Sequence, residues 1–274
     1  MMIDAHHHFW DPARGDYFWM VGEAVAPIAK MIGPKELAPH LVKAGIVKTV
    51  LVQAAPTVAE TEYMLGLADA TEHVAKVVGW IDFENRADLK QLARLAKHPK
   101  FSGVRPMIQD LPDPEWMHRA DVRWAFDAVV DLNLTFDALG FPAHLDAFLR
   151  LFRRYPKMRS VIDHCMKPAI REGGFDPWAS KIALIASETD VYCKLSGIAS
   201  EAKLGWTDET LRPYAEHVLA CFGPKRVMWG SDWPVLNLNG NYETWLDVSK
   251  VLVPIAQHQD VFFQTARNFY RISE

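Results

Sequence analysis

The chain has few cysteines, little net charge and no long apolar run, and each shortage excludes a class of protein. Cys165, Cys193 and Cys221 are widely spaced and odd in number, which predicts free thiols in a reducing cytoplasm instead of a disulfide framework or a zinc ribbon. Thirty basic and 34 acidic residues give a formal net charge of −4, so no general attraction for nucleic acid or anionic membrane is expected. No apolar run reaches the roughly 18 residues of a membrane span, and we expect no signal peptide.

Hydrophobic residues are plentiful in this chain of 274 residues. Half of them are hydrophobic and 23% are charged, which predicts a large buried core and excludes a disordered chain. The length fits one or two domains. Since no linker, charge block or shift of composition divides the sequence, we expect a single domain over residues 1–274.

Short apolar segments alternate with amphipathic ones along the whole chain. The predicted strands are Met2–Phe9, Thr49–Ala54, Val77–Phe83, Gly103–Met107, Thr135–Leu139, Ser160–His164, Val191–Leu195 and Val227–Gly230. The clearest helical patterns are Pro34–Ala44, Arg86–Lys97, Ala143–Tyr155 and Thr207–Phe222. Eight strand–helix units in about 250 residues predict an α/β fold of the TIM-like (β/α)8 barrel type. A doubly wound sheet is the alternative, but its nucleotide-binding forms carry a glycine-rich turn where this chain has histidines.

The first predicted strand ends in three consecutive histidines. Side chains alternate along a strand, so His6 and His8 are expected on one face and His7 on the other. Two imidazoles on one face can hold one metal ion or an anionic substrate. A remnant of a purification tag is the alternative, but the run is short and lies inside a strand-like segment.

Four later strands also carry polar residues near their carboxyl ends, where barrel enzymes place their chemistry. Arg105 can hold a carboxylate or polarise a carbonyl, or be an ordinary salt-bridged arginine. Asp137 either binds substrate hydroxyls or braces Arg105. His164, expected to face away from Asp163, is a candidate ligand or proton-transfer group. Lys194 can stabilise negative charge.

The last strand is followed by Gly230-Ser231-Asp232-Trp233-Pro234. As a carboxylate at a strand end, Asp232 could deprotonate a water molecule. The sequence has no nucleophile elbow, phosphate loop or dinucleotide fingerprint. The combination of a general base, cationic groups and a metal-binding pattern therefore favours hydrolysis by water.

Several of these segments together resemble the amidohydrolase superfamily, and most closely its branch of sugar-acid lactonases, the L-fuconolactonase-like and L-rhamnonolactonase-like proteins. The segments are Ile3–Trp10, Gly103–Arg105, Asp163–Pro168, Lys194–Gly197 and Gly230–Pro234, and they span nearly the whole chain. The resemblance implies a barrel with a metal or metal-like site at the strand ends. In it His6 and His8 correspond to the His-x-His pair, His164 to the histidine of the sixth strand, and Asp232 to the residue that activates water.

The chain departs from the two-metal members of that superfamily. Those enzymes bridge their metals with a lysine or glutamate of the fourth strand, where this sequence offers Arg105, and the fifth strand offers Asp137. We therefore expect one divalent ion, preferably zinc, at His6, His8 and Asp232 with or without His164, or a reaction that needs no metal.

The leading hypothesis is a cytoplasmic lactonase that acts on a small-molecule ring ester of a sugar acid. Asp232 takes a proton from water, Arg105, Lys194 or a bound cation polarises the carbonyl, and the histidines orient these groups. The aromatic residues expected to stack on the sugar are Trp10, Trp19 and Trp233. A metal-dependent decarboxylase of the same fold and a ligand-binding protein without turnover are the alternatives. A homodimer is left open.

Overall fold

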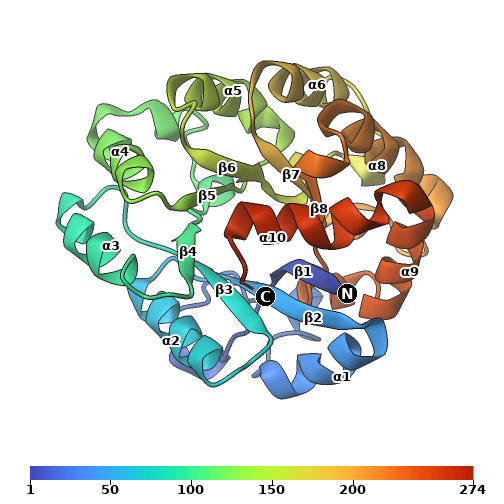
Figure 1. Ribbon diagram of the computed structural model, residues 1–274, viewed down its shortest axis with the longest axis horizontal. Coiled ribbons are helices and arrows are strands. Elements are labelled where there is room, and N and C mark those ends of the chain that lie inside the picture. The colour runs from blue at the N-terminus through green and yellow to red at the C-terminus, as the bar shows by residue number, and fades with distance from the viewer. Residues whose placement is uncertain (274) are drawn as a thin grey trace.

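The computed structural model describes residues 1–273 and contains eight parallel strands that pair in chain order. The strands are β1 (Met2–His7), β2 (Ile46–Val52), β3 (Val74–Gly79), β4 (Phe101–Val104), β5 (Thr135–Ala138), β6 (Arg159–Ile162), β7 (Tyr192–Leu195) and β8 (Val227–Trp229). Just beyond β1 and β8, Asp232 N donates to His6 O over 2.8 Å and His8 N to Trp233 O over 2.8 Å. These bonds join the first strand to the last, and the predicted (β/α)8 barrel is confirmed (Figure 1).

Helices surround the barrel (Figure 1). They are α1 (Pro34–Ala44), α2 (Val58–Asp69), α3 (Leu89–Leu95), α4 (Arg123–Asp131), α5 (Leu145–Arg154), α6 (Trp178–Glu188), α7 (Ile198–Glu201), α8 (Asp208–Phe222), α9 (Tyr242–Leu252) and α10 (Thr265–Tyr270). The predicted bounds of α1 are confirmed, because Pro34 opens that helix and Gly45 ends it in the left-handed region at φ 71°.

Most of the predicted strands extend past the carboxyl ends of the observed strands. The first ends at His7 instead of Phe9, the third at Gly79 instead of Phe83, and the sixth at Ile162 instead of His164. The reason is that buried apolar residues continue past each strand into the loops above the barrel, where they pack without pairing. Burial alone therefore does not mark where a parallel strand ends.

The short helix α10 closes the end of the barrel at which the strands begin. It crosses the middle of the barrel in the foreground of Figure 1. Phe269 and Tyr270 pack with Ile3, Val50 and Val161 inside the barrel, and all five side chains are almost completely buried. Burial of each such side chain contributes roughly 1.5–3 kcal/mol. This end is therefore sealed by a packed core.

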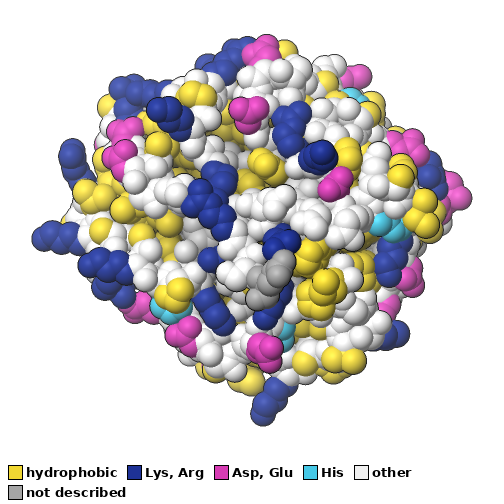
Figure 2. All heavy atoms as spheres, in the orientation of Figure 1, with side chains coloured by type: hydrophobic (Ala, Val, Ile, Leu, Met, Phe, Trp, Pro, Cys, Tyr) yellow, Lys and Arg dark blue, Asp and Glu magenta, His cyan; other side chains and the backbone are white. Residues whose placement is uncertain are grey.

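The face shown in Figure 2 carries no concentrated charge. Basic and acidic side chains are scattered over it and are separated by apolar and uncharged groups. Within residues 1–273, no helix has both the length and the apolar character needed to cross a membrane.

A glycine allows β4 to approach β5 closely. A Cβ atom at Gly103 would lie 2.0 Å from the backbone oxygen of Thr135, which cannot move without breaking the sheet. We expect Gly103→Ala to destabilise the protein by about 3 kcal/mol or more, as overpacked cores do. The measurement is the thermal unfolding midpoint.

The matched control is Gly66→Ala in α2, where a Cβ meets nothing within 4 Å. There alanine gains up to about 1 kcal/mol in helix propensity, so its midpoint should stay or rise. Equal midpoints for Gly103→Ala and wild type would contradict the tight strand contact.

Candidate active site

A cavity of about 280 Å³ lies where the strands end. Its polar lining consists of His8, Arg105, Gln109, Asp110, His164, Lys167 and Asp232. Trp19 and several aliphatic side chains complete the wall. Four of the polar residues expected from the sequence therefore meet here, at the end of the barrel where such enzymes place their chemistry.

The first strand delivers two histidines to one point. His6 Nε2 lies 3.3 Å from His8 Nε2, while His7 points away and its Nε2 lies 2.9 Å from Thr49 Oγ1. The predicted alternation is confirmed. Asp232 Oδ1 completes the group, 3.8 Å from His6 Nε2 and 3.4 Å from His8 Nε2.

His164 reaches the same point through a left-handed turn that follows β6. The four residues from His164 to Lys167 all have positive φ angles, between 49° and 59°. Such angles are rare outside glycine and cost roughly 1–2 kcal/mol for each residue. As a result Asp163 and His164 both turn toward His6, with donor atoms within 4.8 Å of one another. The prediction that Asp163 and His164 face opposite ways is therefore wrong, because strand alternation stops at Ile162.

The loop after β7 supports His164. Ser196 Oγ lies 2.9 Å from His164 Nδ1, and a Cβ atom at Gly197 would lie 2.6 Å from the imidazole ring. Glycine is required here by this close approach and by its φ of 67°. His164 Nε2 is left facing Asp232 Oδ1 at 3.7 Å.

A cluster of buried charges lies beneath the cavity. Lys194 Nζ contacts Asp137 Oδ2 at 2.6 Å, Asp163 Oδ1 at 2.9 Å and His6 Nδ1 at 3.0 Å. Arg105 Nη1 donates to Asp163 Oδ2 over 3.2 Å. Two cations and two carboxylates therefore compensate one another, as buried charges must.

This cluster changes the interpretation of two expected site residues. Lys194 and Asp137 are fully buried and do not line the cavity. The carboxylate of Asp137 accepts from Lys194 and from Tyr270 Oη at 2.8 Å, so it neither faces substrate nor braces Arg105. The residue that braces Arg105 is Asp163.

Only one of the three expected tryptophans reaches the cavity. Trp19 lines it, and its Nε1 donates to Ala54 O over 2.7 Å. Trp10 is completely buried and Trp233 is 3% exposed, and neither lines the cavity. Trp10 instead packs against His8, with ring centroids 6.0 Å apart. The expectation that Trp10 and Trp233 stack on substrate is therefore not supported by their positions.

Burial sets the charges of the site. It lowers the pKa of His6, of His8 and of His164, to about 4 in the last case, so all three imidazoles are neutral at pH 7. Burial raises the pKa of Asp232, but His164 and His8 outweigh it and the net pKa lies below the usual value. The site therefore presents neutral nitrogen donors around one carboxylate.

These donors fit a divalent metal ion. Zinc ligands at 2.0–2.1 Å in a tetrahedron are about 3.3–3.4 Å apart. The separations among His6, His8 and Asp232 are 3.3, 3.4 and 3.8 Å. His8 Nδ1–H donates to Val52 O over 2.8 Å, which leaves His8 Nε2 with a free lone pair, an arrangement that is common among metal-binding histidines.

Several residues near the site were not predicted as site residues. Gln109, Asp110 and Lys167 line the cavity from loops beyond the strands, where no periodic pattern applies. Asp4 accepts from Ser231 N over 2.9 Å and so fixes the segment before Asp232, and its sequence signal is an acid inside an apolar strand. Glu60 accepts from Ala54 N and Ala55 N at 2.9–3.1 Å, and Ala54 walls the cavity.

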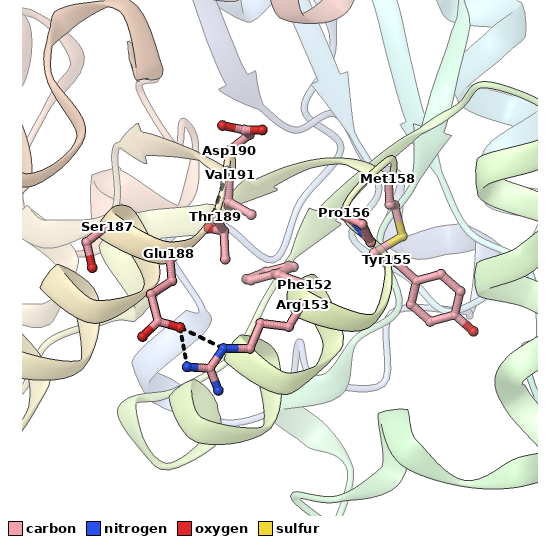
Figure 3. A pocket seen from close by; sticks show the side chains of 10 residues that line it. All are labelled: Phe152, Arg153, Tyr155, Pro156, Met158, Ser187, Glu188, Thr189, Asp190 and Val191. Carbon is pink, nitrogen blue, oxygen red and sulfur yellow. Dashed lines mark hydrogen bonds and ion pairs between the residues drawn. The ribbon is translucent and has the colours of Figure 1, made fainter.

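A second hollow of about 350 Å³ lies at the other end of the barrel, near the carboxyl ends of α5 and α6 (Figure 3). Arg153 points to Glu188 there and donates to it through two nitrogens. None of its ten lining residues is a histidine. This hollow therefore lacks the imidazoles that the cavity at the strand ends contains.

The model of the amidohydrolase family matches residues 3–272. The chain belongs to the amidohydrolase family. It is 42% identical to an L-fucono-1,5-lactonase of Burkholderia ambifaria, over 98% of this chain and 95% of that amidohydrolase. An amidohydrolase of Burkholderia multivorans solved with bound zinc is 28% identical, with a TM-score of 0.93 over the whole of both chains. A dihydroxybenzoic acid decarboxylase from Polaromonas, with manganese, is 13% identical over 98% of this chain and 96% of that one; its TM-score of 0.71 shows the fold alone.

Glu60 makes the stability of this amidohydrolase depend on pH. Burial raises the pKa of its carboxyl to about 8, although two backbone N–H groups oppose the shift. Between the ordinary value of 4.5 and about 8, the unfolded chain releases a proton that the native state keeps. The contribution of Glu60 is therefore complete below pH 4.5 and is lost as pH rises through about 8. Between pH 5.5 and 8.5 this loss is on the order of 3 kcal/mol.

We expect Glu60→Gln to flatten the fall in unfolding free energy between pH 5.5 and 8.5, because the amide does not titrate. Denaturant unfolding at several pH values measures it. Glu62→Gln is the control, since Glu62 lies on the same helix, is half exposed and pairs with Arg94. Parallel pH curves for wild type and Glu60→Gln would contradict the assignment.

Proposed function

We propose that this chain hydrolyses the ring ester of sugar-acid lactones and serves carbohydrate metabolism. It is a hydrolase of cyclic esters, as the L-fucono-1,5-lactonase with 42% identity supports. The observation that carries the proposal is the meeting of Asp232 with His8, His164 and Arg105 in one cavity. A carboxylate can take the proton of an attacking water molecule, and a guanidinium can stabilise the negative oxygen that forms on the ester. Neutral imidazoles can orient these groups.

Asp232 is the proposed general base. Its carboxylate is ionised at neutral pH, lines the cavity and has His8 Nε2 and His164 Nε2 at 3.4 and 3.7 Å. It takes a proton from the attacking water and later gives that proton to the leaving alkoxide.

Arg105 is the proposed donor to the negative oxygen that forms in the tetrahedral intermediate. It is 4% exposed and lines the cavity. Its Nη1 donates to Asp163 and its Nη2 donates to the backbone oxygen of Gln53, so the side chain is held in place. Its Nε–H is buried and has no hydrogen-bond partner among residues 1–273, so the proposed donors are the second N–H groups of its two terminal nitrogens. A buried donor aimed at developing charge is worth about 3 kcal/mol of barrier.

We further propose that His6, His8 and Asp232 hold one divalent ion, with zinc as the preferred metal. The donor spacing and the zinc bound by the Burkholderia multivorans amidohydrolase support this assignment. Such an ion would supply Lewis-acid polarisation of the lactone carbonyl. His164 is not needed in that set and remains beside Asp232 as an orienting group.

Replacing the proposed base tests this function. We expect Asp232→Asn to lower kcat for an aldonolactone at least about 100-fold, because the amide cannot accept the proton of water. The acid released is followed with a pH indicator. The far-ultraviolet spectrum and the unfolding midpoint show whether the variant is folded.

Asp146→Asn is the matched control, since Asp146 is an exposed aspartate that pairs with Lys181 on the outside of the barrel. It should retain full activity. Near wild-type turnover by a folded Asp232→Asn protein would remove the proposed mechanism.

A further inference from the structure

Three polar residues of the cavity have no part in the proposed chemistry. Lys167 Nζ donates to Gln109 Oε1 over 2.6 Å, and Gln109 in turn bonds the carboxylate of Asp110. All three line the cavity, and Lys167 and Gln109 are only partly exposed. We call this group the Lys167 chain.

The backbone fixes Lys167 relative to the catalytic groups. Lys167 ends the left-handed turn that His164 begins, and its N donates to His164 O over 2.8 Å. Within the turn, Trp178 Nε1 donates to Cys165 O over 2.7 Å, and Cys165 and Met166 are completely buried. The turn is therefore rigid and presents an imidazole and an ammonium to the same cavity. Its strain is consistent with a functional constraint.

Two acidic side chains lie near Lys167. Asp110 and Glu201 both lie close enough to interact with the ammonium. The other cation that lines the cavity, Arg105, is paired with Asp163. Asp110 lines the cavity, so its negative charge would repel a carboxylate on a substrate.

The Lys167 chain suits hydroxyl groups instead. A hydroxyl both donates and accepts. Lys167 has two N–H groups beyond the one used on Gln109, and the exposed carboxylate of Asp110 accepts. The ammonium of Lys167 can therefore donate, and the carboxylate of Asp110 can accept, on the same side of the cavity. Neighbouring hydroxyls on a sugar ring offer both the acceptors and the donors that these two groups require.

The loops after β8 and β1 bring apolar side chains to the cavity beside the catalytic groups. The Lys167 chain lies in the loops after β4 and β6, which the strand order places across the barrel from β8 and β1. The residues that line the cavity after β8 and β1 include Val235, Leu238, Trp19 and Val25. A ligand in the cavity thus meets the Lys167 chain on one side and these four apolar side chains, with His8 and Asp232, on the other.

We propose that Lys167, Gln109 and Asp110 form a subsite for the ring hydroxyls of an uncharged lactone and select against lactones that carry carboxylates. This inference rests on the proposed lactonase function and specifies its substrate class. Lys167 and Gln109 bind substrate hydroxyls, and Asp110 holds Gln109 and repels anions.

The test compares three substrates. They are an aldono-1,5-lactone that the wild type hydrolyses, δ-valerolactone, which has the ring ester but no hydroxyls, and 2-pyrone-4,6-dicarboxylate. For Lys167→Met we expect kcat/KM for the aldonolactone to fall 10- to 100-fold, chiefly through KM, as loss of a charged hydrogen bond does. The ratio of kcat/KM for the aldonolactone to that for δ-valerolactone should fall at least about tenfold. Asp110→Asn should raise relative activity on the dicarboxylate.

The controls separate the subsite from the fold and from the function. Lys225→Met, an exposed lysine just before β8 at the other end of the barrel, should leave all ratios unchanged. Gln109→Leu, outside the strained turn, carries the same prediction as Lys167→Met if that variant does not fold. Equal losses for the aldonolactone and δ-valerolactone, or no loss, would overturn the subsite while leaving the lactonase intact. A wild type that hydrolyses no lactone would remove the proposed function and the subsite with it.

Discussion

The arrangement of the site depends on a compensated group of charges inside the barrel. Lys194 and Arg105 share Asp163, Lys194 also holds Asp137, and Lys194 contacts His6 from below. Bringing each ion out of water costs several kcal/mol, which mutual attraction and hydrogen bonds must offset. Once assembled, the cluster leaves few alternative orientations for Arg105 and His6. The chemistry of the cavity floor is therefore fixed from inside the barrel.

The two ends of the barrel contribute to the site in different ways, and this charge cluster lies between them. At the closed end, α10 inserts Tyr270, whose hydroxyl donates to Asp137 Oδ2. At the open end, the loops place Asp232 and His164 over His6 through backbone of positive φ, which only a well-packed surrounding can hold. The strands and α10 thus hold the buried charges, and the loops place Asp232 and His164 above them. The cavity combines a floor fixed by buried charges with loops that carry both polar and apolar side chains.

The sequence predicted the barrel and the core of the site because both follow from periodicity. Alternation along β1 was enough to place His6 and His8 together. Alternation failed at Asp163 and His164, because the strand ends at Ile162 and a left-handed turn follows. Lys194 lies near the end of β7 as expected, but its side chain is buried beneath the cavity and does not line it. Trp233 was expected to contact substrate, but it is buried behind the residues that line the cavity. No local sequence pattern distinguishes a residue that lines a cavity from one packed behind the lining.

The central claim is that the cavity at the strand ends opens lactone rings, and its most direct test is product analysis with purified protein. A panel of aldonolactones is followed for acid release, before and after removal of metal by a chelator, and the same preparation is tested with aromatic carboxylic acids for carbon dioxide. The account predicts acid release from at least one aldonolactone and no carbon dioxide. No acid from any lactone by a folded, metal-loaded protein, together with carbon dioxide from an aromatic acid, would contradict it and favour the decarboxylase.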